Sequence, residues 1–248
     1  MSYLNHFCCD SGRVAPYVIL VQSQALAKCI GEKISAELVS EGDLYHVYTG
    51  KFEDVPVSVI ACGIGSPSAA MALEELALCG ATAVIRLGTA QPIADNSKVG
   101  DVVLATAGVK MDGTSGEYVV MEFPAVANFP LTWLLARKAE QLLPAGSFHM
   151  GIVEGRDVFT RRKDFDRTLV SGSCIYEKAL ARGSALCSDM ETAAVLVVSR
   201  YLGIRGASVN LVTAGGPADL SCCIDLALAG FCDLRKADES GDDLCLIT

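Results

Sequence analysis

The chain has 248 residues, of which 51% are hydrophobic and 20% charged, with a formal net charge of −9 and a pI near 4.8. This composition indicates a well-filled core rather than disorder, and the acidic balance argues against a nucleic-acid binder, which would present a basic face. No uninterrupted apolar run reaches the ~20 residues that a transmembrane helix needs, and Met1–Asp10 lacks the pattern of a secretory signal. We therefore expect a cytoplasmic protein with no nucleic-acid or membrane partner.

The 11 cysteines could suggest a disulfide framework, but their number is odd and the chain is large and apolar. Most of them lie in hydrophobic stretches, where Cys behaves as a small buried hydrophobe: Cys29, Cys62, Cys79, Cys187, Cys222 and Cys223. No CxxC pair with partner ligands occurs, so the sequence does not support a zinc site. We expect reduced, structural cysteines.

Apolar runs of strand length alternate with helical patterns along the whole chain. The first half predicts a strand over Tyr17–Gln22, a helix over Ala25–Ile34, a hairpin of Tyr45–Gly50 with Val55–Cys62, and a helix over Ser68–Cys79. The second half predicts strands over Ala83–Leu87 and Asp101–Thr106, helices over Leu131–Leu142 and Met190–Tyr201, a strand over Ile204–Val212, and a helix from Leu220 to about Lys236. Strands that are apolar throughout are buried on both faces, as in a sheet covered by helices. Because no linker interrupts the pattern, we expect one α/β domain over residues 1–248.

The segment Cys62–Ser68 (CGIGSPS) joins a predicted strand to a helix. A dinucleotide fingerprint needs a third glycine where Ser68 stands and an acidic residue ~20 positions later, and neither is present. The segment is therefore interpreted as a tight turn in which glycines allow close packing of the backbone.

An arginine stands inside the apolar strand Ala83–Leu87 and is followed by Gly88 and Thr89. Burying a guanidinium is costly unless it meets an anion, and open α/β sheets bind ligands at the carboxyl ends of their strands. The pattern favours an anion site made of Arg86 and the Thr89 hydroxyl. A structural salt bridge to Arg86 is the alternative.

Two carboxylates stand in Ser188–Ala194 (SDMETAA), where a helix of small residues begins. Carboxylates at a helix start are ordinarily capping or dipole residues. The helix that follows is too apolar for the surface, so we expect Glu191 to be partly buried and to need a partner. A pair of ligand hydroxyls would serve.

In this order and spacing, the three motifs resemble the nucleoside phosphorylase family, which includes uridine phosphorylase and the hexameric purine nucleoside phosphorylases. The resemblance extends over residues 48–90, 98–115, 121–129 and 188–194, and the stretch 109–129 is specifically similar to the uridine phosphorylase branch. It implies a three-layer α/β/α fold with a central mixed sheet. It also implies assembly into homodimers or hexamers.

The resemblance further implies roles for individual residues. Arg86 and Thr89 would bind phosphate, the co-substrate. Met190 and Glu191 would hold the ribose, and His6 would reach the ribose of a neighbouring subunit. Arg86 and Glu191 would carry the catalysis, which is mainly electrostatic, and no metal or organic cofactor is expected.

The base pocket differs from the family pattern. The resemblance implies that Phe159 lies against the base. Arg162 and Asp164 are the nearest equivalents of the glutamine and arginine with which uridine phosphorylases read uracil, although the basic run 161–163 could equally be a solvated loop. The purine branch has a base-protonating aspartate where this chain has Ala214. Pyrimidine nucleosides are therefore favoured over purine nucleosides.

The phosphate site departs from the family pattern as well. Gln22 replaces a glycine whose amide binds phosphate, and Leu26 replaces an arginine. A second arginine, lent by a neighbouring subunit, falls at Asp43, and Lys28 could compensate only by reaching back along its helix. Losing a charged partner in a closed site typically costs ~2–5 kcal/mol, so we expect weak phosphate affinity.

The function predicted from the sequence is phosphorolysis of a pyrimidine, uridine-like nucleoside to the free base and ribose 1-phosphate. Two alternatives stay open because of the replacements in the phosphate site. One is a hydrolytic nucleosidase, and the other is a catalytically silent relative that binds a nucleoside.

Overall fold

The computed structural model describes residues 3–158 and 174–241. A mixed sheet of ten strands runs through this part of the chain. In spatial order its strands are β11 (Ala185–Asp189), β10 (Phe148–Arg156), β8 (Val102–Met111), β12 (Arg205–Val212), β7 (Ala83–Pro92), β3 (Tyr17–Val21), β6 (Val55–Ala61), β5 (His46–Phe52) and β4 (Glu37–Glu41), and β9 (Ala125–Val126) pairs with β8. Strands β3, β6, β7 and β12 form a parallel block, and antiparallel strands lie on both sides of it.

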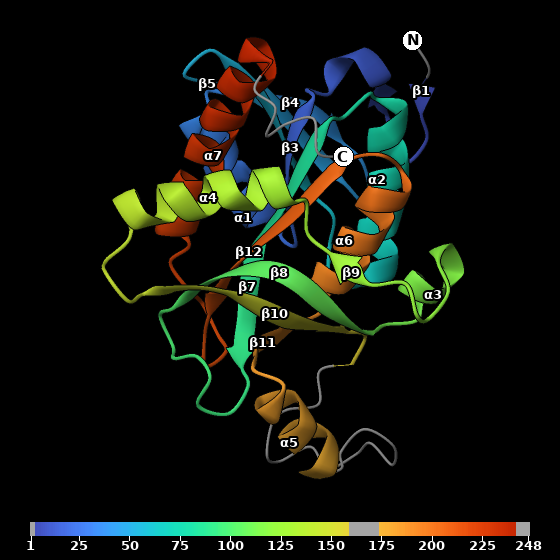
Figure 1. Cartoon of the computed structure of the whole chain (residues 1–248). Helices are drawn as coiled ribbons and strands as arrows, with labels where there is room; N and C mark the ends of the chain where they lie inside the picture. The colour runs from blue at the N-terminus through green and yellow to red at the C-terminus, as the bar shows by residue number, and fades with distance from the viewer. Residues whose placement is uncertain (1–2, 159–173, 242–248) are drawn as a thin grey trace.

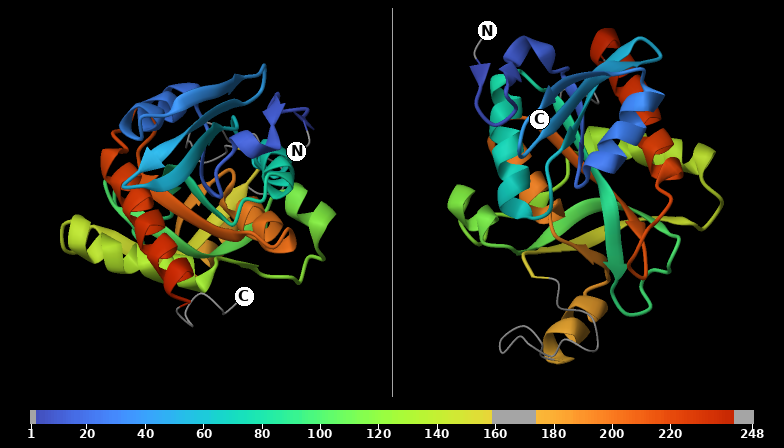
Figure 2. Two further views of the ribbon diagram at one scale, coloured as in Figure 1. Left: turned by 90° about the horizontal axis from the view of Figure 1, so that it is seen from above. Right: turned by 180° about the vertical axis from the view of Figure 1, so that it is seen from behind.

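Helices cover both faces of this sheet (Figures 1 and 2). One face packs against α1 (Gln24–Lys33), α4 (Phe129–Leu142) and α7 (Ser221–Ser240), and the other against α2 (Ser66–Leu78) and α6 (Thr192–Tyr201). The remaining elements are the hairpin β1 (Tyr3–Leu4) with β2 (Cys9–Asp10), the 3-10 turn Ser11–Arg13, α3 (Thr114–Tyr118) and α5 (Cys174–Arg182). This confirms the expected three-layer α/β/α fold with a central mixed sheet. In the described residues, no helix combines the length and apolar character needed to cross a bilayer.

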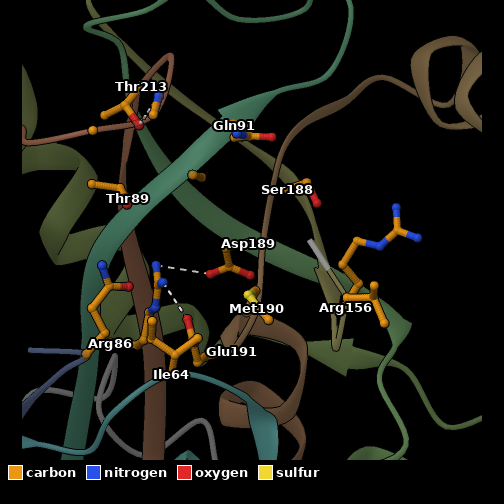
Figure 3. A pocket seen from close by; sticks show the side chains of 15 residues that line it. Ile64, Arg86, Thr89, Gln91, Arg156, Ser188, Asp189, Met190, Glu191 and Thr213 are labelled. Carbon is orange, nitrogen blue, oxygen red and sulfur yellow. Dashed lines mark hydrogen bonds and ion pairs between the residues drawn. The ribbon is translucent and has the colours of Figure 1, made fainter. Parts of the chain in front are cut away.

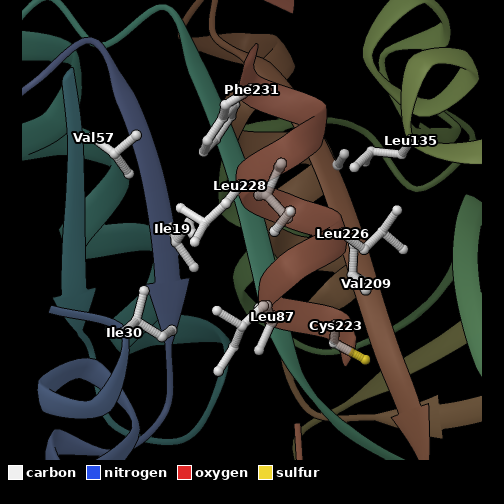
Figure 4. Close-up of a cluster of buried hydrophobic side chains, with 14 of the residues drawn as sticks. Ile19, Ile30, Val57, Leu87, Leu135, Val209, Cys223, Leu226, Leu228 and Phe231 are labelled. Atoms are coloured by element: carbon white, nitrogen blue, oxygen red, sulfur yellow. The ribbon is translucent and has the colours of Figure 1, made fainter. Parts of the chain in front are cut away.

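The main core lies between the sheet and the layer of α1, α4 and α7. Figure 4 shows Ile19 and Leu87 of the sheet facing Leu228 and Phe231 of α7, and all four are buried. Each such side chain contributes roughly 1.5–3 kcal/mol when it leaves water. Since neighbouring residues of a strand point to opposite faces, this packing of Leu87 turns Arg86 toward the layer of α2 and α6.

Several element boundaries differ from those expected from the sequence. Strands β7 and β8 continue to Pro92 and Met111, because the ladder persists after the apolar run has ended. Strands β4 and β11 were not predicted, since each mixes charged or polar residues with apolar ones. Helix α6 begins at Thr192 rather than Met190, because Asp189 still belongs to β11.

The cysteines follow the sequence interpretation in part: Cys62, Cys187 and Cys223 are buried, and Cys79 and Cys222 are half-buried. The nine cysteines whose side chains the structure describes are thiols rather than disulfides, and five of them are buried. Cys29 was placed with the buried ones, and this was wrong: it is exposed on α1. The amphipathic pattern of α1 turns Ala27 and Ile30 to the core instead.

An additional strand pairing brings distant segments together. Strand β11 is parallel to β10 and also pairs antiparallel with the end of β7, where Ser188 faces Gln91 and Cys187 faces Pro92. The residues that follow Ser188 therefore lie beside the carboxyl end of β7. Both segments carry candidate site residues.

Close packing of α6 on β10 depends on Gly155. An ideal Cβ at this position would lie 2.6 Å from the Ala193 Cβ and 2.7 Å from the Ala193 backbone nitrogen. Because backbone cannot move aside cheaply, we expect Gly155→Ala to lower the free energy of unfolding by about 3 kcal/mol. Urea denaturation measures this, and Gly116→Ala is the control because a Cβ there meets nothing within 4 Å. Equal stability of the two variants would contradict the packing argument.

Candidate functional site

A cavity of about 410 Å³ opens where β3, β7 and β12 end, beside the start of α6 (Figure 3). Such a position, outside the carboxyl ends of parallel strands, is where open α/β sheets bind ligands. Its walls come from six separate segments of the chain: Gln22, Ile64, Arg86, Thr89, Ala90, Gln91, Arg156, Val158, Ser188, Asp189, Met190, Glu191, Thr213, Gly215 and Gly216.

Arg86 lies at the inner end of this cavity and is held by two carboxylates. Its Nη1 is 3.0 Å from Asp189 Oδ2, and its Nη2 donates to Glu191 Oε2 at 2.7 Å. The side chain of Arg86 is 4% exposed, and those of the two acids 0% and 3%. The structural salt bridge, the alternative expected from the sequence, is therefore present, and Arg86 also lines the cavity.

A buried polar network fixes these charges. Arg86 Nη1 also donates to the Asn210 amide oxygen, and Asn210 Nδ2 donates to Ser208 Oγ at 3.0 Å. Ser208 Oγ lies 2.8 Å from Thr192 Oγ1, which in turn donates to Asp189. Because each member has a partner, the guanidinium is held in one orientation.

The charges of this cluster are mutually dependent. Burial alone would lower the pKa of Arg86, but Asp189 and Glu191 outweigh it, so the pKa is raised above its ordinary value. Burial raises the pKa of the Asp189 carboxyl, and the Arg86 charge acts against this rise. Arg86 is therefore fully charged at neutral pH.

Glu191 is the N-cap residue of α6, but its side chain makes no capping hydrogen bond. Its Oε2 accepts from Arg86, and its Oε1 accepts from the backbone nitrogen of Gly65 at 2.7 Å. Gly65 has φ +105°, a conformation that favours glycine, and precedes α2. The turn 62–68 is thus the tight strand-to-helix connection expected from the sequence, and it also supplies a donor to Glu191.

Gly88 leaves the space that the Arg86 side chain occupies. An ideal Cβ at Gly88 would lie 2.8 Å from Arg86 Nη2 and 2.9 Å from Cζ. The guanidinium folds over this glycine to reach the two carboxylates. The sequence Arg86-Leu87-Gly88 therefore has a local steric reason.

A second arginine lines the opposite side of the cavity. Arg156 ends β10, and in Figure 3 it and Arg86 lie on opposite sides of Asp189 and Met190. Its side chain is 8% exposed, and its Nη1 is 3.7 Å from Glu154 Oε1. Within the described residues, the buried Nε of Arg156 has no hydrogen-bond partner.

Cys62 lies beside the cluster of Arg86 and Glu191. Burial raises the pKa of its thiol to about 12, so the group is protonated at neutral pH and is not a nucleophile. Among the residues that the structure describes, no three His, Cys, Asp or Glu side chains gather as metal ligands would. The described side chains that line the cavity can bind a ligand through their charges and through hydrogen bonds.

The structure brings four predicted site residues into this one cavity: Arg86, Thr89, Met190 and Glu191. His6 lies outside it, with Nδ1 2.9 Å from Glu75 Oε1. The predicted base-binding residues Phe159, Arg162 and Asp164 lie outside the described residues.

The replaced phosphate positions are also located. Gln22 lines the cavity, Leu26 packs against the main core, and Lys28 is exposed on α1. Asp43 is exposed, and its neighbour Gly42 lies against the backbone of His6. The two positions expected to face a neighbouring subunit, 6 and 43, thus belong to one surface region.

Sequence reasoning missed several residues that line or support the site. Arg156 and Ser188 line the cavity, and Ser208 and Asn210 orient Arg86. The last pair carried a usable signal, since both are polar residues at alternate positions of an otherwise apolar strand. Arg156 follows Glu154 and Gly155 at the end of β10, and no motif marked it.

Known proteins resemble this chain in sequence and in fold. The sequence matches the Phosphorylase superfamily over residues 16–222. Uridine phosphorylase of Thermococcus kodakarensis is 33% identical over 220 residues, which cover 84% of this chain and 76% of that protein. Uridine phosphorylase of Treponema pallidum is 33% identical over 210 residues, with 84% and 80% covered. The crystal structure of uridine phosphorylase from Vibrio fischeri superposes with a TM-score of 0.78 at 28% identity, covering 94% of this chain and 98% of that one. The chain belongs to the phosphorylase superfamily.

Proposed function

We propose that this chain is a nucleoside phosphorylase that cleaves uridine-type nucleosides with phosphate, releasing the free base and ribose 1-phosphate. The observation that carries the proposal is the cavity shared by Arg86, Thr89, Met190 and Glu191. These residues come from two regions about 100 positions apart, and they are the ones that the family pattern marks. The uridine phosphorylases among the relatives support the choice of substrate.

Each of these residues has a role in the proposal. Arg86 and the Thr89 hydroxyl bind phosphate at the inner end of the cavity. Met190 packs against the ribose, and Glu191 accepts hydrogen bonds from its 2′ and 3′ hydroxyls. Glu191 suits this role because its oxygens are oriented by Gly65 and Arg86 before any ligand arrives.

The chemistry is a displacement at C1′ of the ribose. Phosphate enters on one side of the sugar while the base leaves on the other, and positive charge develops on the ring in the transition state. A phosphate held at Arg86 and the Glu191 carboxylate would both stabilise that charge. Arg86 and Glu191 are therefore the catalytic residues of the proposal.

Three further parts of the proposal concern the base side, the partner subunit, and the compartment and co-substrate. Phe159, Arg162 and Asp164 stay predictions for the base side. His6 is proposed to complete the ribose site of a partner subunit in a homodimer or hexamer. We expect a cytoplasmic enzyme with phosphate as co-substrate and no other cofactor.

Phosphate affinity is expected to be low for a uridine phosphorylase. The Arg86 charge is already shared by two carboxylates at 3.0 and 2.7 Å, so an incoming dianion meets a largely neutralised group. Leu26 adds no charge, and Asp43, where it faces the site of a partner subunit, adds repulsion.

The experiment measures uracil release from uridine at rising phosphate concentration. We expect release that depends on phosphate and saturates only at high concentration. The variant with Leu26→Arg and Asp43→Arg should saturate at a phosphate concentration at least roughly tenfold lower than the wild type, since charge-assisted hydrogen bonds to phosphate are strong. Leu142→Arg with Asp95→Arg makes the same change of charge at exposed positions and serves as the control.

The outcomes separate the possible functions. Release without phosphate would indicate a hydrolytic nucleosidase, and no release from any nucleoside a silent relative. Tight phosphate binding by the wild type would contradict the assignment of Leu26 and Asp43 to the phosphate site.

A further inference from the structure

Arg156 is a buried cation that uses little of its hydrogen-bonding capacity among the residues that the structure describes. Within the described residues its ion pair with Glu154 spans 3.7 Å, and its Nε has no partner. Glu154 is fully buried, and its oxygens accept from Tyr176 Oη at 2.8 Å and Ser188 Oγ at 2.6 Å. A guanidinium with so few hydrogen bonds is costly to bury, so an acceptor arriving in the cavity would stabilise it.

The place of Arg156 in the cavity indicates which part of a substrate it meets. Arg86 holds the anion at one end, and Arg156 lies on the other side of Asp189 and Met190 (Figure 3). Nucleophile and leaving group occupy opposite sides of C1′ in a displacement. With phosphate at Arg86 and the sugar at Glu191, the base therefore extends toward Arg156.

We infer that Arg156 contacts a carbonyl oxygen of the nucleobase and makes the site selective for oxo-pyrimidines of the uracil type, an inference that rests on the proposed function. A donor-only, permanently charged group requires an acceptor, which the carbonyls of uracil provide.

The same contact assists departure of the base. As the C1′–N1 bond breaks, its electron pair passes to the base, and the new C1′–O bond joins the sugar to phosphate. The negative charge spreads from N1 into the carbonyl oxygens, where Arg156 stabilises it. The proton of the hydrogen phosphate ion ends on the released base.

The test compares Arg156→Met with wild type on uridine and on 5-fluorouridine, whose base is more acidic and leaves more readily. We expect kcat/KM for uridine to fall roughly ten- to a hundredfold, the range for a hydrogen bond to a charged group. The loss on 5-fluorouridine should be smaller, because its base needs less stabilisation. The kcat/KM of Arg156→Lys should lie between those of wild type and Arg156→Met. The control Arg200→Met, at an exposed position, should leave kcat/KM unchanged for both substrates.

Equal losses on both substrates, or no loss, would overturn the inference. Calorimetric binding of uracil in the presence of phosphate gives a readout that is independent of turnover. If wild type binds uracil without cleaving uridine and Arg156→Met binds it at least tenfold more weakly, the proposed function fails while the contact stands. If both proteins bind uracil equally, or neither binds it, the contact is wrong.

Discussion

Replacing Arg86 with methionine is expected to abolish phosphate-dependent uracil release. It should also lower the free energy of unfolding by about 3–5 kcal/mol, the usual cost of leaving a buried charge without its partner. Asp189 and Glu191 are both buried against Arg86, at 3.0 and 2.7 Å. Methionine fills the space but leaves both carboxylates uncompensated. Uracil release and urea denaturation, measured on the same preparation, check the two effects.

The pH dependence of the same variant follows from Asp189. Burial raises the pKa of this carboxyl and the Arg86 charge acts against the rise, so without Arg86 its protonation is favoured in the folded state more than in the unfolded state. Folding then takes up protons, so the variant gains stability relative to wild type as pH falls. We expect the deficit to be largest at neutral pH and to shrink toward pH ~5.

Two further variants separate loss of the site from loss of the fold. Arg86→Lys keeps a positive charge without the fork that reaches Asp189, Glu191 and Asn210 together, so it should recover more stability than turnover. Arg200→Met makes the methionine change at an exposed position of α6 and should be neutral. Unchanged phosphate-dependent release by a folded Arg86→Met variant would contradict the phosphate assignment.

Glu191→Gln is expected to lower kcat/KM for uridine at least a hundredfold, and to lower it much less for 2′-deoxyuridine. A carboxylate that accepts from two ribose hydroxyls loses charge-assisted bonds, each worth about 1.5–3 kcal/mol. The deoxy substrate lacks one of those hydroxyls and so has less to lose. The preference of the enzyme for ribose should therefore weaken in the variant.

Kinetic constants for both substrates provide the measurement, with exposed Glu140→Gln as control. Glutamine keeps an oxygen for Gly65 or Arg86 and preserves the shape of the side chain. If Glu191 serves only to hold Arg86, the substitution should lower kcat/KM for both substrates by the same factor. Equal losses would thus remove the ribose assignment while leaving the salt bridge in place.

The layered fold could be predicted from local sequence patterns. Apolar runs such as Tyr17–Val21 and helical patterns such as 24–33 depend on which residues alternate within a few positions, and this determines the faces that must be buried. Local sequence also identified Arg86 as a charged residue inside an apolar strand, and it identified the turn at Gly65.

Only the tertiary structure decided which groups contact the buried charged residues. Arg86 and Glu191 are 105 positions apart, and they meet because β11 pairs with the end of β7. Arg156 belonged to no motif in the sequence, and the fold places it in the same cavity. A local pattern records that a side chain is buried, whereas its partner is set by the closure of distant strands. A buried charge therefore marked a site in the sequence, and the fold determined the groups that surround it.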